Sequence, residues 1–238
     1  TPLYSSAASD VYKRQVKEFG EPGFVWADST ELIVNPCVEI GLYPVDEETG
    51  ETGWQACNLS TINCARIKTK KDFFESCKAA SIIGTLQAGF SKMSYLGEVT
   101  ERILRREALL GVSMTGIMER HDICLDPEIQ KQGARVVRKT NRELAKKIGI
   151  NAAARTTCVK PEGTASCILG TSSGIHPHHA KRYIRRVQAN KMEDIYQHFK
   201  KTNPRACEES VWSANDSDDV ICSVSYTHLR AHETRHDL

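Results

Sequence analysis

The spacing of hydrophobic side chains predicts an amphipathic helix over residues 71–96. Apolar residues recur there at intervals that place them roughly on one face of a helix with 3.6 residues per turn. Asp72 stands at the start, where a carboxylate can accept hydrogen bonds from the free N–H groups of the first turn. The side chains expected on the buried face are Phe73, Cys77, Ile83, Leu86 and Phe90.

A second helix is predicted over residues 126–148, and both of its ends carry clear signals. Asp126 is a suitable N-cap, Pro127 fits the first turn, and Gly149 follows the last helical residue. Its expected apolar face consists of Ile129, Val136, Val137, Leu144 and Ile148. A third, shorter helix is expected over residues 192–201.

Short apolar runs between these helices predict strands. Residues 109–114 are bounded by charges and read as a buried strand, and residues 156–160 read as another. Residues 57–63 fit either a strand or a loop. Strands that alternate with helices indicate an α/β fold with a parallel sheet.

Turns are expected at three further places. Pro36 favours an extended backbone at the preceding residue, so residues 35–40 are interpreted as a loop or a strand edge. Residues 161–166 are interpreted as a turn that leads into a short helix, and residues 172–177 as a second turn.

Composition and charge exclude several classes of protein. The 238 residues are 40% hydrophobic and 26% charged, which is ordinary for a globular protein. The net charge of +2 is too balanced for a protein that coats nucleic acid or a membrane surface, and no apolar run approaches the roughly 20 residues of a membrane span. Nine cysteines, an odd number with no CxxC pair, favour free thiols in a reducing, cytoplasmic compartment.

The two ends of the sequence resemble non-native additions. DVYKRQ, at residues 10–15, and VSYTH, at residues 224–228, can be encoded by one DNA element read on its two opposite strands. This is similar to the translated end of a transposase sequencing adapter. We therefore expect residues 1–15 and 224–238 to be adapter-like ends, and residues 16–223 to be an internal fragment of a longer enzyme.

Asn35, Cys37 and Glu39 form the first group of residues with reactive side chains. In an extended segment, alternate residues project to one side, so an amide, a thiol and a carboxylate would face one site. Negative charge disfavours a thiolate, so this set suits a thiyl radical beside a general base better than an ionic nucleophile. The alternative is a buried cysteine in a turn, with Glu39 on the surface.

The second group follows the predicted strand at residues 156–160. Free N–H groups at a helix N-terminus can bind phosphate, and glycine permits close approach. Such a loop would contain Pro161, Glu162, Gly163, Thr164, Ala165 and Ser166. An ordinary capping turn looks similar, so both interpretations stay open. His176, His178 and His179 could in principle bind a metal, although neighbouring histidines rarely converge on one ion.

Five motifs occur in an order that resembles the catalytic chain of ribonucleotide reductase, and most closely its adenosylcobalamin-dependent (class II) type. They are Asn35-Pro36-Cys37-Val38-Glu39, Cys57-Asn58-Leu59-Ser60-Thr61-Ile62-Asn63, Gly111-Val112-Ser113-Met114-Thr115-Gly116, Pro161-Glu162-Gly163-Thr164-Ala165-Ser166 and Ser173-Gly174-Ile175-His176-Pro177. The resemblance covers nearly all of residues 16–204. It implies that the chain is part of a ten-stranded α/β barrel, with a central finger loop and much of the second half-barrel.

The resemblance also implies roles for individual residues. Cys37 would become the thiyl radical that removes the ribose 3′-hydrogen, and Glu39 would act as the general base at the 3′-hydroxyl. Asn35 would bind the substrate hydroxyls. Cys57 would be one of two cysteines that reduce the 2′ position, its partner lying upstream of this sequence. Residues 161–166 would bind the substrate phosphates.

The implied cofactor is adenosylcobalamin. The implied partners are a ribonucleotide substrate, expected to be a triphosphate, a thioredoxin-like or other dithiol reductant, and allosteric nucleotide effectors in the full-length enzyme. No nucleic acid or membrane partner is expected. Three alternatives remain open: the large subunit of a metal-radical (class I) reductase acting on diphosphates, a non-catalytic nucleotide-binding module, and a metal-binding protein. The fragment by itself is expected to be inactive.

Overall fold

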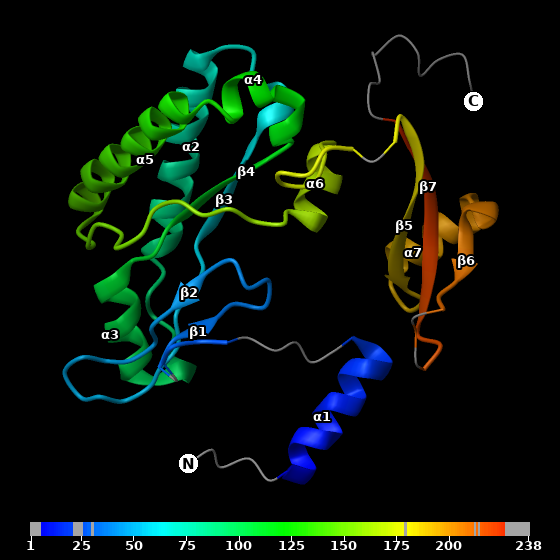
Figure 1. Ribbon diagram of the computed structural model, residues 1–238, viewed down its shortest axis with the longest axis horizontal. Coiled ribbons are helices and arrows are strands. Elements are labelled where there is room, and N and C mark those ends of the chain that lie inside the picture. The colour runs from blue at the N-terminus through cyan, green and yellow to red at the C-terminus, as the bar shows by residue number, and fades with distance from the viewer. Residues whose placement is uncertain are drawn as a thin grey trace.

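The computed structural model describes residues 6–20, 26–29, 31–178, 180–211, 213 and 215–226. A mixed α/β unit contains a short parallel sheet with α2 and α5 beside it, and a separate three-stranded sheet lies toward the C-terminal end (Figure 1). None of the described helices is long and apolar enough to cross a lipid bilayer.

The parallel sheet is built around β3 (Leu59–Asn63) and β4 (Gly111–Thr115). Their register runs from Leu59 opposite Gly111 to Asn63 opposite Thr115. Residues 155–158 extend the parallel pairing on the other side of β4, where the Val112 N–H donates to the Thr156 carbonyl at 3.0 Å. The prediction of a parallel sheet is therefore confirmed.

The strand predicted over residues 156–160 is shorter than expected. A single bridge, between Val112 and Thr157, joins this segment to β4, and the Cys158 N–H donates to the Val112 carbonyl at 3.1 Å. Among the described residues no further bridge joins residues 159–162 to β4, although β4 itself continues to Thr115. Residues 159–162 are thus free to form the loop that precedes α6.

Helix α2 (Lys70–Ala88) begins and ends differently from the prediction. Thr69, not Asp72, is the N-cap, and Asp72 completes a capping box by accepting the Thr69 N–H at 2.8 Å. The helix stops at Ala88, and a 3₁₀ turn (Ser94–Leu96) and α3 (Gly97–Glu107) follow. The apolar spacing beyond Gly89 therefore does not continue the helix.

The buried face of α2 also differs from the predicted one. Phe73 and Cys77 are buried as expected, but Ile83, Leu86 and Phe90 are 54%, 49% and 79% exposed. Small residues form the rest of the buried face: Ala80, Ser81, Gly84, Thr85 and Ala88. A Cβ on Gly84 would lie only 1.8 Å from a Leu110 methyl, so the helix approaches the sheet too closely for larger side chains.

Helix α5 (Pro127–Ile148) matches its prediction closely. The Asp126 carboxylate accepts the N–H groups of Glu128 and Ile129, and Gly149 ends the helix with φ +76°. Its buried residues are Ile129, Gly133, Val137, Asn141 and Ala145, whereas Ile148 is exposed. Together α2, α5 and the sheet enclose a core that includes Ile62, Phe73, Val112, Ile123 and Val137.

Asn141 is a buried polar residue that ties three segments together. Its amide donates to the Thr85 hydroxyl at 3.0 Å and accepts the Ala153 N–H at 2.9 Å. We expect Asn141→Ala to lower the free energy of unfolding by about 1–3 kcal/mol, because it leaves the Ala153 N–H without a partner. Lys139→Ala, on the exposed side of α5, is the control and should change little. Thermal or urea unfolding of the protein measures both; an unchanged midpoint for Asn141→Ala would contradict this account.

The remaining elements are short and carry the loops of the candidate site. They are β1 (Ile33–Val34) and β2 (Gly41–Leu42), which pair antiparallel, a 3₁₀ turn (Cys64–Arg66), a second 3₁₀ turn (Ile117–Arg120), α4 (His121–Cys124) and α6 (Gly163–Leu169). The C-terminal sheet has the order β5 (Arg182–Asn190), β7 (Asp218–Tyr226), β6 (Cys207–Glu209), with α7 (Asp194–Thr202) and a 3₁₀ turn (Pro204–Ala206) between β5 and β6. Helix α7 confirms the helix predicted near residues 192–201.

The terminal segments are more ordered than their sequences suggest. Helix α1 (Ser6–Phe19) covers most of the adapter-like N-terminal end, and β7 continues through residues 224–226 by pairing with β5. Alanine, lysine, arginine and glutamine favour a helix whatever their origin, and β5 offers a partner to any extended segment. Residues 227–238 lie outside the described residues.

The barrel implied by the resemblance is not formed by this chain. Among the described residues the sheets have two, two and three strands. In a closed barrel every strand pairs on both sides, whereas within the described part of the chain β3 pairs only with β4. The α/β class is confirmed, and the described residues form no closed barrel; that they are part of one stays a prediction.

Candidate active site

Cys37 lies at the tip of the loop between β1 and β2. The backbone turns at Pro36 and Cys37, and Val38 adopts φ +62°. The segment is therefore a tight turn, and the expected extended row of Asn35, Cys37 and Glu39 is wrong. The reason is a local hydrogen bond, since the Asn35 side-chain oxygen accepts the Ile40 N–H at 3.1 Å and closes the loop. Cys37 is exposed as a result.

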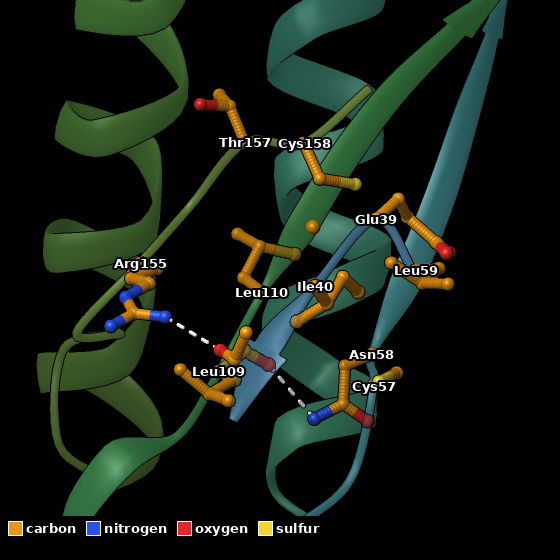
Figure 2. Close-up of a pocket in the computed structure, with 12 residues that line it drawn as sticks. Glu39, Ile40, Cys57, Asn58, Leu59, Leu109, Leu110, Arg155, Thr157 and Cys158 are labelled. Carbon is orange, nitrogen blue, oxygen red and sulfur yellow. Dashed lines mark hydrogen bonds between the residues drawn. The ribbon is translucent and has the colours of Figure 1, made fainter. Parts of the chain in front are cut away.

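The β1–β2 hairpin is anchored to the parallel sheet by an arginine. The Arg155 guanidinium donates to the Gly41 carbonyl at 2.6 Å, and the Asn58 amide donates to the Leu109 carbonyl at 2.9 Å (Figure 2). The Arg155 bond holds the start of β2 beside the parallel sheet, and the Asn58 bond joins the residues that precede β3 and β4.

Glu39 lines a cavity of about 130 Å³ together with two thiols, those of Cys57 and Cys158 (Figure 2). The Glu39 side chain is only 6% exposed, and within the described chain neither of its carboxylate oxygens has a hydrogen-bond partner. The Lys160 ammonium lies 3.7 Å from its Oε1. The alternative that places Glu39 on the surface is therefore wrong.

Both thiols in this cavity are held in the protonated form. Burial, and next the negative charge of Glu39, raise the pKa of Cys57. The same two causes raise the pKa of Cys158 to about 11. Protonated thiols are poor ionic nucleophiles but carry the S–H hydrogen that radical chemistry needs. The cavity thus combines a carboxylate with two hydrogen-atom donors.

Cys158 was missed by the sequence reasoning. Its sulfur fits because the facing residue is Gly111, where a Cβ would lie 3.0 Å from it. In an extended segment, Cys158 and Lys160 project to the same side. Because this segment was expected to lie in the same sheet as the strand after Cys57, the alternate positions of Cys158 and Lys160 are the signal that could have placed both residues near Glu39.

The loop at residues 161–166 forms the predicted turn into a short helix, α6. Glu162 adopts φ +54° and is buried, and its carboxylate accepts the Thr61 hydroxyl at 2.7 Å. The Ser166 hydroxyl donates to the Gly163 carbonyl at 2.9 Å. Two expected phosphate ligands, Glu162 and Ser166, thus have their side chains engaged in the fold, whereas Gly163 and Thr164 are exposed.

A second turn, residues 172–175, packs against the start of this loop. The Ser173 hydroxyl donates to the Pro161 carbonyl at 2.6 Å. Gly174 has φ +53°, and a Cβ there would lie 2.6 Å from the Lys160 carbonyl oxygen and 3.0 Å from that of Pro161. Only glycine permits this contact, so Gly174 fixes the path of the chain between Lys160 and Pro161.

His178 contacts Glu119, the residue that binds the backbone of the second turn. Its Nε2 lies 3.2 Å from Glu119 Oε1, the oxygen that also accepts the Ser172 N–H at 2.7 Å. No group of three or more histidine, cysteine or acidic side chains in the described part of the chain is arranged to hold a metal ion. His176 is exposed, and His179 lies outside the described residues.

Comparisons with known proteins give relatives of one kind. Adenosylcobalamin-dependent ribonucleoside-triphosphate reductases of Dictyostelium discoideum and Mycobacterium phage D29 are 24% and 26% identical over 198 and 199 residues, each covering 74% of this chain. The reductase of Lactobacillus leichmannii is 22% identical over 218 residues. No protein-family model matches the chain.

A solved structure agrees with these sequences. The crystal structure of a B12-dependent (class II) ribonucleotide reductase superimposes with a TM-score of 0.55 at 18% identity, covering 83% of this chain and 30% of that one. The chain spans 24%, 27% and 28% of the three relatives named above, about a quarter of their length. The resemblance to class II ribonucleotide reductase is confirmed in sequence and fold.

Proposed function

We propose that the protein containing this chain reduces ribonucleotides to 2′-deoxyribonucleotides by a thiyl-radical mechanism, with adenosylcobalamin as its cofactor. The observation that carries the proposal is the buried carboxylate of Glu39, which shares one cavity with two protonated thiols. The names of the relatives support a triphosphate substrate. Those names do not favour the class I alternative.

Cys37 is the residue proposed to carry the radical. It fits a cofactor bound outside this chain, because the hairpin presents its thiol at an exposed tip. Adenosylcobalamin, when bound, supplies radical generation. The Cys37 sulfur, once it has lost its hydrogen atom, takes the ribose 3′-hydrogen and returns it at the end of the reaction.

Glu39 and Cys57 are proposed to act on the substrate radical. Glu39 accepts the proton of the 3′-hydroxyl, which favours loss of the 2′-hydroxyl as water. Of the two hydrogens that Cys57 and a second thiol supply, one leaves with the 2′-hydroxyl as water and the other is delivered to C2′; the two sulfurs, having given up two electrons in total, form a disulfide. A thioredoxin-like or other dithiol reductant restores the two thiols by exchange.

The loop at residues 161–166 is proposed to bind the substrate phosphates, through backbone N–H groups and the exposed Thr164 rather than through Glu162 or the Ser166 hydroxyl. The cavity at Glu39 holds only about 130 Å³, enough for the reacting edge of a ribose but not for a nucleotide. The rest of the substrate would extend toward this loop.

Gly174→Ala tests this assignment. A Cβ would press on the carbonyls of Lys160 and Pro161 and displace the loop, so we expect the KM for CTP to rise at least about tenfold. Gly50→Ala is the matched control, since Gly50 also has positive φ, at +72°, but has no atom within 4 Å of a Cβ. Steady-state kinetics of the full-length protein give both values. An equal KM in the two variants would remove the loop from substrate binding.

The proposal also covers the domain organisation, the effectors and the cellular location of the protein. Residues 16–223 would form the finger loop and much of the second half of a ten-stranded barrel in the full-length enzyme, and residues 1–15 and 224–238 would be adapter-derived. Allosteric nucleotide effectors would act on regions outside this chain. Free, protonated thiols suit a reducing compartment, so the proposed location is cytoplasmic.

The proposal is tested by assaying the full-length protein for conversion of CTP to dCTP with a dithiol reductant. We expect turnover only when adenosylcobalamin is present. Turnover that needs a separate metal-radical subunit instead would move the enzyme to class I. Nucleotide binding without turnover under either condition would favour a non-catalytic binding module.

A further inference from the structure

The carboxylate of Glu39 is buried in an unusual way. Both oxygens are withdrawn from water, and neither accepts a hydrogen bond from the described residues. A buried charge without compensation costs several kcal/mol, so such a group normally loses its charge or acquires a partner. The cation that lies against it is Lys160, with its Nζ 3.7 Å from Oε1.

The other groups around Glu39 do not compensate its charge. Cys57 and Cys158 face it as protonated thiols, and Glu162 adds a further negative charge near Cys158. Arg155 lines the same cavity, but its guanidinium donates to the Gly41 carbonyl. The Lys160 side chain is only 20% exposed, which strengthens its attraction to the carboxylate.

The backbone of Lys160 is fixed more firmly than its place in a loop suggests. Gly174 packs directly on the Lys160 carbonyl, and Ser173 donates to the carbonyl of the next residue, Pro161. On its N-terminal side, Cys158 is bonded to β4 through the Val112 carbonyl. The backbone on both sides of Lys160 is therefore fixed, and this places its ammonium next to Glu39.

We propose that Lys160 is a positioning residue for the reaction: its ammonium, 3.7 Å from Oε1, pairs with the Glu39 carboxylate and holds it in place at the cavity, ready to accept a proton. The inference rests on the proposed function and goes beyond it, because the resemblance gives Lys160 no role. A protonated Glu39 could not take the proton of the 3′-hydroxyl. Lys160 also adjoins the proposed phosphate loop, so one short segment, residues 158–161, orients both the base and the loop.

Lys160→Met in the full-length enzyme tests this role, because it keeps the length of the side chain and removes the charge. We expect kcat at neutral pH to fall at least about tenfold while the KM for CTP changes little. An unpaired carboxylate retains its proton to higher pH, so the acidic limb of the kcat profile should move to higher pH. Raising the pH should then recover much of the lost activity.

Other titratable groups do not produce the same shift. Cys57 and Cys158 have a raised pKa, that of Cys158 being about 11, so they stay protonated over the acidic limb. Lys160→Arg should retain the wild-type profile by restoring the charge, and Lys92→Met, at an exposed position, should behave as wild type. If Lys160→Met does not fold, Lys160→Gln carries the same test.

The outcomes separate this inference from the proposed function. Wild-type enzyme without reductase activity would overturn both. Active wild type, together with an unshifted acidic limb in Lys160→Met and an equal loss of kcat at every pH, would leave the reductase in place and overturn the role of Lys160. A Lys160→Arg variant as impaired as Lys160→Met would also overturn it.

Discussion

Cys37→Ser should abolish dCTP formation by the full-length enzyme while leaving nucleotide binding and folding intact. The side chain is exposed at the tip of the β1–β2 turn, so an oxygen in place of sulfur disturbs no packing. An O–H bond is much stronger than an S–H bond, and serine therefore cannot take over the radical. Product analysis of CTP incubated with adenosylcobalamin and a dithiol measures the effect.

Cys222→Ser, in the C-terminal sheet, is the control for this experiment and should retain turnover. If Cys37→Ser keeps full activity, Cys37 does not carry the radical, and the non-catalytic alternative gains support. The fold of the variant can be checked independently by its thermal midpoint, which we expect to equal that of the wild type.

Glu39→Gln should lower kcat by about 10²–10⁴-fold, the usual contribution of a general base. The substitution is nearly isosteric and removes a buried negative charge, so the protein should still fold. It also leaves Lys160 without its counter-ion, in a side chain only 20% exposed. Rates of dCTP formation under saturating CTP measure the loss.

Glu31→Gln is the matched control, because Glu31 lies just before β1 and is exposed. It should keep the wild-type kcat. A Glu39→Gln enzyme that also retains the wild-type kcat would mean that the 3′-hydroxyl loses its proton to another group or to water.

The elements whose ends carry local signals could be predicted from the sequence. Helix α5 was placed correctly because Asp126, Pro127 and Gly149 each act through the chain's own backbone. Helix α2 was overextended, and Ile83, Leu86 and Phe90 were assigned to the wrong face. Its packing is decided by the close approach of Gly84 to Leu110, a contact between distant segments that periodicity does not encode.

The candidate site was also predicted only in part, because some of its contacts join segments that are distant in the sequence. Glu39 and Cys57 do share a cavity, but the assumed extended geometry at residues 35–39 was wrong, because Asn35 closes a turn with its own side chain. Cys158 and Lys160 were missed, since their place beside Glu39 depends on the parallel pairing of residues 155–158 with β4. The residue roles themselves stay predictions.

A single-turnover experiment tests the central claim most directly. Pre-reduced full-length enzyme, freed of external dithiol, is mixed with adenosylcobalamin and excess CTP, and the products and the cysteine oxidation state are measured. Our account predicts about one dCTP per active site and a disulfide that includes Cys57, because two thiols supply the two electrons. Absence of dCTP, or dCTP formed while Cys57 remains a free thiol, would contradict it.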